Sequence, residues 1–243
     1  MSSAESPTKI THVIFDFDGV LIDSERQYSL ANSRCLEPYG RKFTSEMKCA
    51  QMGRKKRDAV TTLLAMNDLI DKVDVDEYLT KYDELLDELI PISPILPGAT
   101  ELIHHFNAHE IPLAICTGSD SVEFEMKSRK HADWLAKVPL RVLSGSDPDI
   151  THGKPHPEPY LVTMRRFAIQ PSSPKSVLVF EDSINGARSA IAAGMTVIMV
   201  PQEEFLPSNW TQVRSDLEPQ LAEIISSLVE FQPVKYGLPH LNF

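Results

Sequence analysis

The sequence predicts an α/β protein: a mostly parallel sheet with helices on both faces, plus an inserted all-helical unit. Short, almost continuously apolar runs alternate with helix-like segments along most of the chain. This is the pattern of buried parallel strands that are joined by right-handed helical crossovers. One stretch after the first apolar run contains helical patterns only, which predicts the insertion.

The predicted strands are bounded by polar or turn-forming residues. In chain order they are "HVIFDFD" from His12, "IPLAICTGS" from Ile111, "LRVLSGSD" from Leu140, "SVLVFEDS" from Ser176 and "MTVIMVPQ" from Met195. Helices are expected between them, for example "GATELIHHFNAHE" before the second strand and "NGARSAIAAG" after the fourth. Gly194 fits the position just beyond a helix end, where a left-handed backbone is common.

The helical insertion is predicted from three patterns: "RQYSLANSRCLEPYG", "RKKRDAVTTLLAMNDL" and "VDEYLTKYDELLDELI". In the third, apolar residues recur at spacings of three and four, as on one face of a helix. The segment "PISPILPGA" then reads as the return to the sheet, because prolines and glycine end regular structure. We therefore expect an α/β core over residues 1–23 and 93–243 and a helical cap over residues 24–92.

The bulk properties limit the possible partners. The chain has 243 residues, is 42% hydrophobic and carries a net charge of -10, which argues against a broad surface for nucleic acid or anionic membranes. The start "MSSAESPTK" lacks the apolar stretch of a signal peptide, and no apolar run approaches the roughly 18 residues that span a bilayer. The three cysteines are scattered, as in a reducing compartment. We expect a cytoplasmic protein that is a monomer or weak dimer.

Polar residues gather where the predicted strands end, which is the edge at which open α/β sheets bind ligands. Asp16 and Asp18 end the first strand, and Thr117-Gly118-Ser119 ends the second. Asp182 follows the fourth strand, and Lys154 lies in the loop "HGKPHPEPY" after the third. Although far apart in sequence, these residues should converge on one crevice.

The spacing of the two aspartates indicates a metal site. Residues two apart in a strand point to the same side, so Asp16 and Asp18 place two like charges together and need a counter-charge. Mg²⁺ prefers oxygen ligands and commonly uses a few carboxylates, so we expect Asp16, Asp18 and Asp182 to hold it. Lys154 adds a fixed positive charge, and Gly19 permits a tight turn with close backbone approach.

The segments "DFDGVLIDSE", "CTGS", "GKPHPEPY" and "VFEDSINGARSAIAAGM" resemble the four ordered motifs of the haloacid dehalogenase superfamily of phosphohydrolases. The resemblance spans roughly residues 12–201 and implies a Rossmann-like core with an α-helical cap. It implies that Asp16 is the nucleophile that takes up the phosphoryl group, and that Asp18 is the general acid and then the general base.

The same resemblance implies how the substrate and the metal are held. Thr117 and Lys154 would bind the phosphoryl oxygens, with Gly19, Gly118 and Ser119 beside them. Lys154 would also restrain the nucleophile. Mg²⁺ would sit on the side chains of Asp16 and Asp182 and on the backbone carbonyl of Asp18.

Two further segments, "EFEMKSRKH" and "FQPVKYGLP", are similar to the pseudouridine-5′-phosphatase branch of that superfamily. We therefore expect a small phosphate monoester as the partner, with pseudouridine 5′-phosphate as the leading substrate. Gly53, Arg54 and Lys55, in the cap segment "MGRKKR", are the expected leaving-group contacts. A sugar-phosphate phosphatase and a β-phosphoglucomutase-like phosphomutase remain as alternatives.

Overall fold

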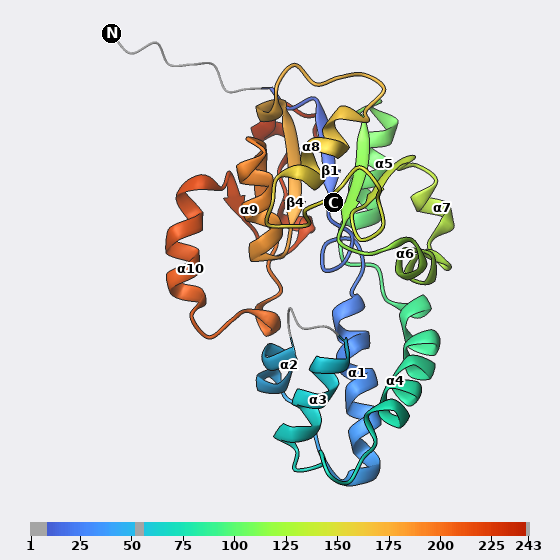
Figure 1. Cartoon of the computed structure of the whole chain (residues 1–243). Helices are drawn as coiled ribbons and strands as arrows, with labels where there is room; N and C mark the ends of the chain where they lie inside the picture. The colour runs from blue at the N-terminus through green and yellow to red at the C-terminus, as the bar shows by residue number, and fades with distance from the viewer. Residues whose placement is uncertain (1–8, 52–55, 242–243) are drawn as a thin grey trace.

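The computed structural model describes residues 9–51 and 56–241. Its centre is a six-stranded sheet in the order β3-β2-β1-β4-β5-β6, and every neighbouring pair is parallel (Figure 1). The strands are β1 (His12–Phe15), β2 (Leu113–Thr117), β3 (Leu140–Leu143), β4 (Val177–Glu181), β5 (Thr196–Met199) and β6 (Glu223–Ile224). The predicted parallel sheet is confirmed. The sequence did not predict β6, since two residues are too few to show a periodic pattern.

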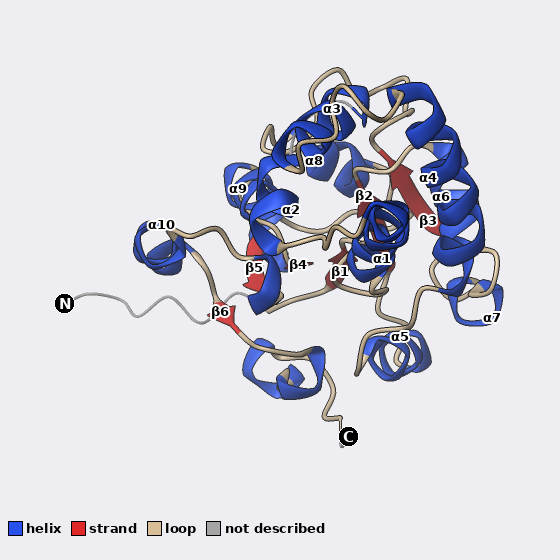
Figure 2. Cartoon of the chain, turned by 90° about the horizontal axis from the view of Figure 1, so that it is seen from below, coloured by secondary structure: helices blue, strands red, loops and turns tan. Residues whose placement is uncertain are grey.

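Helices cover both faces of the sheet (Figure 2). On one face, Phe15 of β1 belongs to a core cluster with Phe106, Phe124 and Trp134. These come from α5 (Ala99–Ala108), α6 (Ser121–Ser128) and α7 (Ala132–Leu135). On the other face, Ile14 of β1 clusters with residues of α8 (Glu158–Arg165) and α9 (Ile184–Ala192). Because the strand is buried on both sides, it needs the continuous apolar run seen in the sequence.

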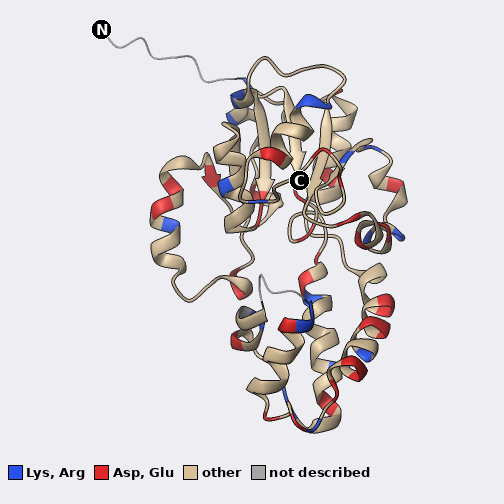
Figure 3. Ribbon diagram, in the orientation of Figure 1, with Lys and Arg blue, Asp and Glu red and all other residues tan. Residues whose placement is uncertain are grey.

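An all-helical unit lies between β1 and α5, below the sheet in Figure 1. Its helices are α1 (Ser24–Leu36), α2 (Ser45–Gln51), α3 (Lys56–Met66) and α4 (Val75–Leu89), and they share a separate hydrophobic core. The buried face of α4 includes Tyr78, Tyr82 and Leu89. Several of the other positions of this helix are Asp or Glu, which are red in Figure 3. The predicted fold class, an α/β sheet with a helical insertion, is therefore confirmed.

The remaining elements connect or close the sheet. They are α10 (Trp210–Leu217) and the 3₁₀ turns η1 (Glu37–Tyr39), η2 (Ile90–Ile92), η3 (Pro174–Ser176), η4 (Glu203–Phe205), η5 (Glu218–Gln220), η6 (Leu228–Glu230) and η7 (Pro233–Tyr236). After β6 the chain returns to the core, where the ring of Phe231 packs against Phe106 and Phe180. Across residues 9–51 and 56–241, no helix has both the length and the apolar character needed to cross a membrane.

Candidate active site

The carboxyl ends of the three central strands lie side by side, because β1 pairs with β2 on one side and with β4 on the other. Asp16 is the first residue beyond β1, and its N–H donates to the carbonyl of Phe180 at 2.9 Å, which continues the ladder. Thr117 is the last residue of β2, and Asp182 directly follows β4. The fold thus places polar residues from distant parts of the sequence at one edge of the sheet.

Lys154 reaches this edge from the loop between β3 and α8. Its ammonium donates to Asp16 Oδ1 at 2.6 Å, to Glu181 Oε1 at 2.5 Å and to the carbonyl of Cys116 at 3.0 Å. All three N–H donors of the lysine therefore have a partner. Burial raises the pKa of Asp16 to about 7, although the charge of Lys154 acts in the opposite direction. The charges of Asp16 and Glu181 raise the pKa of Lys154 despite its burial, so the lysine stays protonated.

Glu181 is fully buried and fixes the position of Lys154. Its Oε1 also accepts the hydroxyl of Tyr160 at 2.6 Å, and its Oε2 accepts the hydroxyl of Ser183 at 3.1 Å. A Cβ at Gly186 would lie 1.9 Å from this carboxylate, so the glycine makes room for it. From the sequence, Glu181 beside Asp182 is interpreted as a supporting carboxylate or as a charge at the strand end, and its contact with Lys154 is that of a supporting carboxylate.

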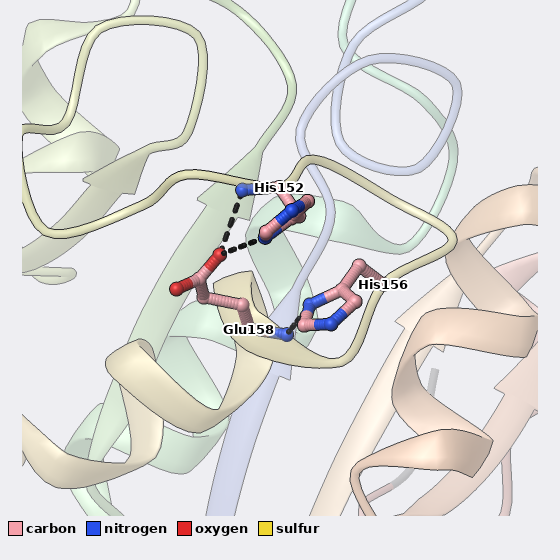
Figure 4. Close-up of side chains that lie close together, drawn as sticks. All are labelled: His152, His156 and Glu158. Atoms are coloured by element: carbon pink, nitrogen blue, oxygen red, sulfur yellow. Dashed lines mark hydrogen bonds and ion pairs between the residues drawn. The ribbon is translucent and has the colours of Figure 1, made fainter.

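Figure 4 shows the side chains that hold the Lys154 loop in place: His152, His156 and Glu158. Glu158 Oε2 accepts the backbone N–H groups of Thr151 and His152 at 3.0 and 2.7 Å, and His156 Nδ1 accepts the N–H of Glu158 at 3.3 Å. These three side chains are close enough to share a metal ion. However, Glu158 and His156 already accept backbone hydrogen bonds within the loop, and His152 Nδ1 lies 3.3 Å from Glu158 Oε2. Their clear effect is to fix the loop that presents Lys154.

The Asp18 side chain has a different set of partners. Its Oδ1 accepts the hydroxyl of Ser24 at 2.5 Å and lies 2.9 Å from Lys127 Nζ. Its Oδ2 accepts the hydroxyls of Ser119 at 2.9 Å and Thr117 at 3.3 Å. Burial alone would raise the pKa of Asp18, but the Lys127 charge and these hydrogen bonds lower it. Asp16 and Asp18 therefore sit in opposite electrostatic settings, although they are two residues apart.

Lys127 was missed by the sequence-based prediction. It lies on α6 with a side chain only 5% exposed, three residues after the buried Phe124. Residues three apart share a helix face, so a lysine on the apolar face of "EFEMK" was the available signal. That signal is weak, because lysines often cover apolar surface with the stem and keep the ammonium in water.

The third predicted carboxylate, Asp182, lies near Asp16 and Glu181, with an oxygen from each of the three within 4.8 Å of the others. In the described part of the chain Lys154 forms ion pairs with Asp16 and Glu181, but no cation pairs with Asp182. Burial and the two neighbouring carboxylates raise the pKa of Asp182 well above its usual value. Gly19, at φ +77°, leaves room here, because a Cβ on it would lie 2.0 Å from Asp182 Oδ2. An oxygen-rich, anionic site of this kind fits a hard divalent cation such as Mg²⁺.

The structure places the other predicted residues as follows. Ser119 is buried and contacts Asp18, whereas Gly118 is exposed with open space around it. Gly53, Arg54 and Lys55 lie outside the described residues. The structure therefore brings together Asp16, Asp18, Gly19, Thr117, Ser119, Lys154 and Asp182.

The fold and the site define an α/β enzyme whose polar centre lies at the carboxyl edge of a parallel sheet, beside a helical insertion. Residues 13–200 match the family model described as haloacid dehalogenase-like hydrolase. The chain belongs to this family, and the family predicted from the motifs is confirmed.

Curated relatives agree with this membership. The chain is 36% identical to (DL)-glycerol-3-phosphatase 2 of Arabidopsis thaliana over 95% of its own length and 92% of that protein. It is 32% identical to a protein of Drosophila melanogaster named "Probable pseudouridine-5′-phosphatase", over 95% of both chains. A solved structure of a haloacid dehalogenase family hydrolase from Deinococcus radiodurans has the same fold, with a TM-score of 0.77, 23% identity and coverage of 96% and 100%. The predicted enzyme class, phosphoric monoester hydrolase, is confirmed by these relationships.

Proposed function

We propose that this enzyme is a Mg²⁺-dependent phosphomonoesterase that forms a phosphoryl-enzyme on Asp16, and that its substrate is pseudouridine 5′-phosphate. The observation that carries the proposal is the pair of aspartates with separate partners. Asp16 is restrained by Lys154 at 2.6 Å beside Asp182, and Asp18 is held apart by Ser24 and Ser119. One carboxylate is thereby free to act as nucleophile and the other to move protons.

In the first step, a carboxylate oxygen of Asp16 attacks phosphorus, and the bond from phosphorus to the leaving oxygen breaks. Asp18 gives a proton to that oxygen, which leaves as an alcohol. Because the Lys127 charge favours the ionised form of Asp18, the fraction of enzyme in which this carboxyl is protonated carries out this step. In the second step, Asp18 takes a proton from water, which attacks the phosphorus of the aspartyl-phosphate. Phosphate is released and the Asp16 carboxylate is restored.

The transferring group carries negative charge, which this site must offset. Lys154 would bind the phosphoryl oxygens together with Thr117, next to the backbone of Gly118 and Ser119. Mg²⁺, held by Asp16, Asp182 and the backbone carbonyl of Asp18, would supply further positive charge when bound. Asp182, which has no cationic partner among the described residues, supports this ligand set.

The leaving group has room in a cavity of about 600 Å³ between α4 and α6. Its lining includes Tyr28, Tyr82 and Met126, and it reaches Lys127, which contacts Asp18. A volume and an aromatic lining of this kind suit a planar base with its ribose. The Drosophila relative, whose name specifies pseudouridine 5′-phosphate, points the same way. We also propose that residues 24–92 form a cap domain that closes over the bound leaving group.

A second candidate substrate is glycerol 3-phosphate, favoured by the 36% identity to the Arabidopsis glycerol-3-phosphatase. The two are separated by kcat/KM for phosphate release from pseudouridine 5′-phosphate, uridine 5′-phosphate, glycerol 3-phosphate and β-glucose 1-phosphate, with Mg²⁺ or with EDTA. We expect Mg²⁺-dependent release, highest for pseudouridine 5′-phosphate. A higher value for glycerol 3-phosphate would replace the substrate but keep the phosphatase. Isomerisation of the sugar phosphate in place of phosphate release would indicate the phosphomutase alternative.

A further inference from the structure

Lys127 is a buried lysine that the reaction scheme above does not use. Its ammonium lies 2.9 Å from Asp18 Oδ1 and donates to Ser119 Oγ at 2.8 Å. The Ser119 hydroxyl donates in turn to Asp18 Oδ2 at 2.9 Å. Lys127 therefore acts on both oxygens of the same carboxylate, on one directly and on the other through Ser119.

Burying an ammonium is costly unless it is paired and hydrogen-bonded, and an apolar side chain would fill the same space without that cost. The presence of a buried lysine beside Asp18 is therefore not explained by packing alone. The contacts of Asp18 come from three parts of the fold: Ser24 from α1, Ser119 from the β2 edge and Lys127 from α6. Together these contacts hold the Asp18 carboxyl group in one orientation. Lys127 also lines the cavity between α4 and α6, so the fixed carboxyl stands next to the space proposed for the leaving group.

We propose that Lys127 is a positioning residue that fixes the Asp18 carboxyl for proton transfer to the leaving oxygen. This inference rests on the proposed function, because it assigns Lys127 a part in that reaction. It predicts a dependence on the leaving group. An alkoxide leaving group needs the proton, so its departure suffers when Asp18 is misplaced. A p-nitrophenolate leaving group is a weak base and departs without it.

The test is single-turnover release of the leaving group with Mg²⁺, comparing benzyl phosphate and p-nitrophenyl phosphate, which both carry one aromatic ring. In Lys127→Met we expect release of benzyl alcohol to slow by about 10- to 100-fold, within the range that acid–base catalysis contributes. Release of p-nitrophenolate should slow by less than about threefold, since it does not depend on the proton. Lys127→Arg, which keeps a charged donor, should recover part of the benzyl phosphate rate. Lys130→Met, at an exposed lysine nearby, is the matched control.

A comparison in the Asp18→Asn background remains informative if Lys127→Met alone does not fold, since the double variant leaves no charge of this pair unpartnered. If Lys127 acts through Asp18, then Asp18→Asn/Lys127→Met is as fast as Asp18→Asn with benzyl phosphate. An added loss in the double variant would overturn the inference. Equal slowing of both substrates by Lys127→Met, or no slowing of either, would also overturn it. So would a change confined to the concentration that gives half the maximal single-turnover rate, which would mean that Lys127 binds the leaving group directly. If the wild-type enzyme released no p-nitrophenolate, or released it equally well in EDTA, the proposed function would be overturned and this inference with it.

Discussion

Replacing Lys154 by methionine tests how the centre of the site is held together. The lysine side chain, 11% exposed, separates two carboxylates that are 8% and 0% exposed, those of Asp16 and Glu181. Methionine matches its stem but removes the charge and all three donated hydrogen bonds. Two buried carboxylates then face each other with no cation between them.

The loss of stability can be estimated from the geometry. Removing one partner of a buried ion pair typically costs about 3–5 kcal/mol. For a chain of 150–250 residues each kcal/mol lowers Tm by roughly 2–4 °C, so we expect a fall of roughly 6–20 °C at pH 8 without metal. Loss of the phosphatase activity should accompany it, because Lys154 is also proposed to bind the phosphoryl group.

The defect should depend on pH in a direction that the structure determines. Burial already raises the pKa of Asp16 to about 7 with Lys154 in place, and removing the lysine raises it further. A carboxyl group whose pKa is higher in the folded protein contributes stability while protonated, and this contribution is lost as the pH rises through the folded value. The Lys154→Met defect should therefore be smallest near pH 5 and largest near pH 8.

Thermal unfolding followed by circular dichroism at both pH values, in EDTA, provides the measurement. Lys175→Met is the matched control, because Lys175 is exposed and surface substitutions usually change stability by about 0.5 kcal/mol or less. If Lys154→Met and Lys175→Met had the same Tm at pH 8, the proposed electrostatic role of Lys154 would be wrong. A defect of equal size at pH 5 and pH 8 would contradict the assignment of its cause to Asp16 and Glu181.

Three other predictions address the nucleophile and the metal. Asp16→Asn should abolish phosphate release and incorporation of ³²P into acid-quenched protein; normal turnover in this variant would rule out the covalent route. Gly19→Ala should weaken Mg²⁺ binding in calorimetry, because its Cβ would lie 2.0 Å from Asp182 Oδ2. Gly40→Ala, at a similar positive φ but in open space, should leave Mg²⁺ binding unchanged. Equal Mg²⁺ affinities of the two variants would contradict the role of Gly19 in making room for Asp182. In wild-type enzyme, Mg²⁺ affinity should fall by about tenfold per unit below pH 7, where Asp16 becomes protonated, and a flat profile would exclude Asp16 as a ligand.

The sequence by itself determined the class of fold and the nature of the centre. Apolar runs long enough for strands, alternating with helical patterns, indicate a parallel sheet, because a strand covered on both faces can carry few polar residues. Asp16 and Asp18 were conspicuous for the same reason, since charged residues are costly next to Phe15 and Phe17 in such a run. Local periodicity and the cost of burying charge are properties of short segments, so they can be read without a structure.

Only the tertiary structure decided the partners of Asp18 and Glu181. Lys127 and Asp18 meet because α6 packs beside the chain that follows β1, where the ring of Phe124 contacts Phe17. Glu181 accepts the hydroxyl of Tyr160 because α8 packs on the face of the sheet that includes Val177 and Val179 of β4. Asp16 and Asp18 differ in electrostatic setting although they are neighbours in sequence. The pKa of a carboxyl group depends on the charges and donors within a few ångströms. For Asp18, two of these, Ser119 and Lys127, come from segments more than 100 residues away. Such distances are set by packing, and no pattern along the chain encodes them.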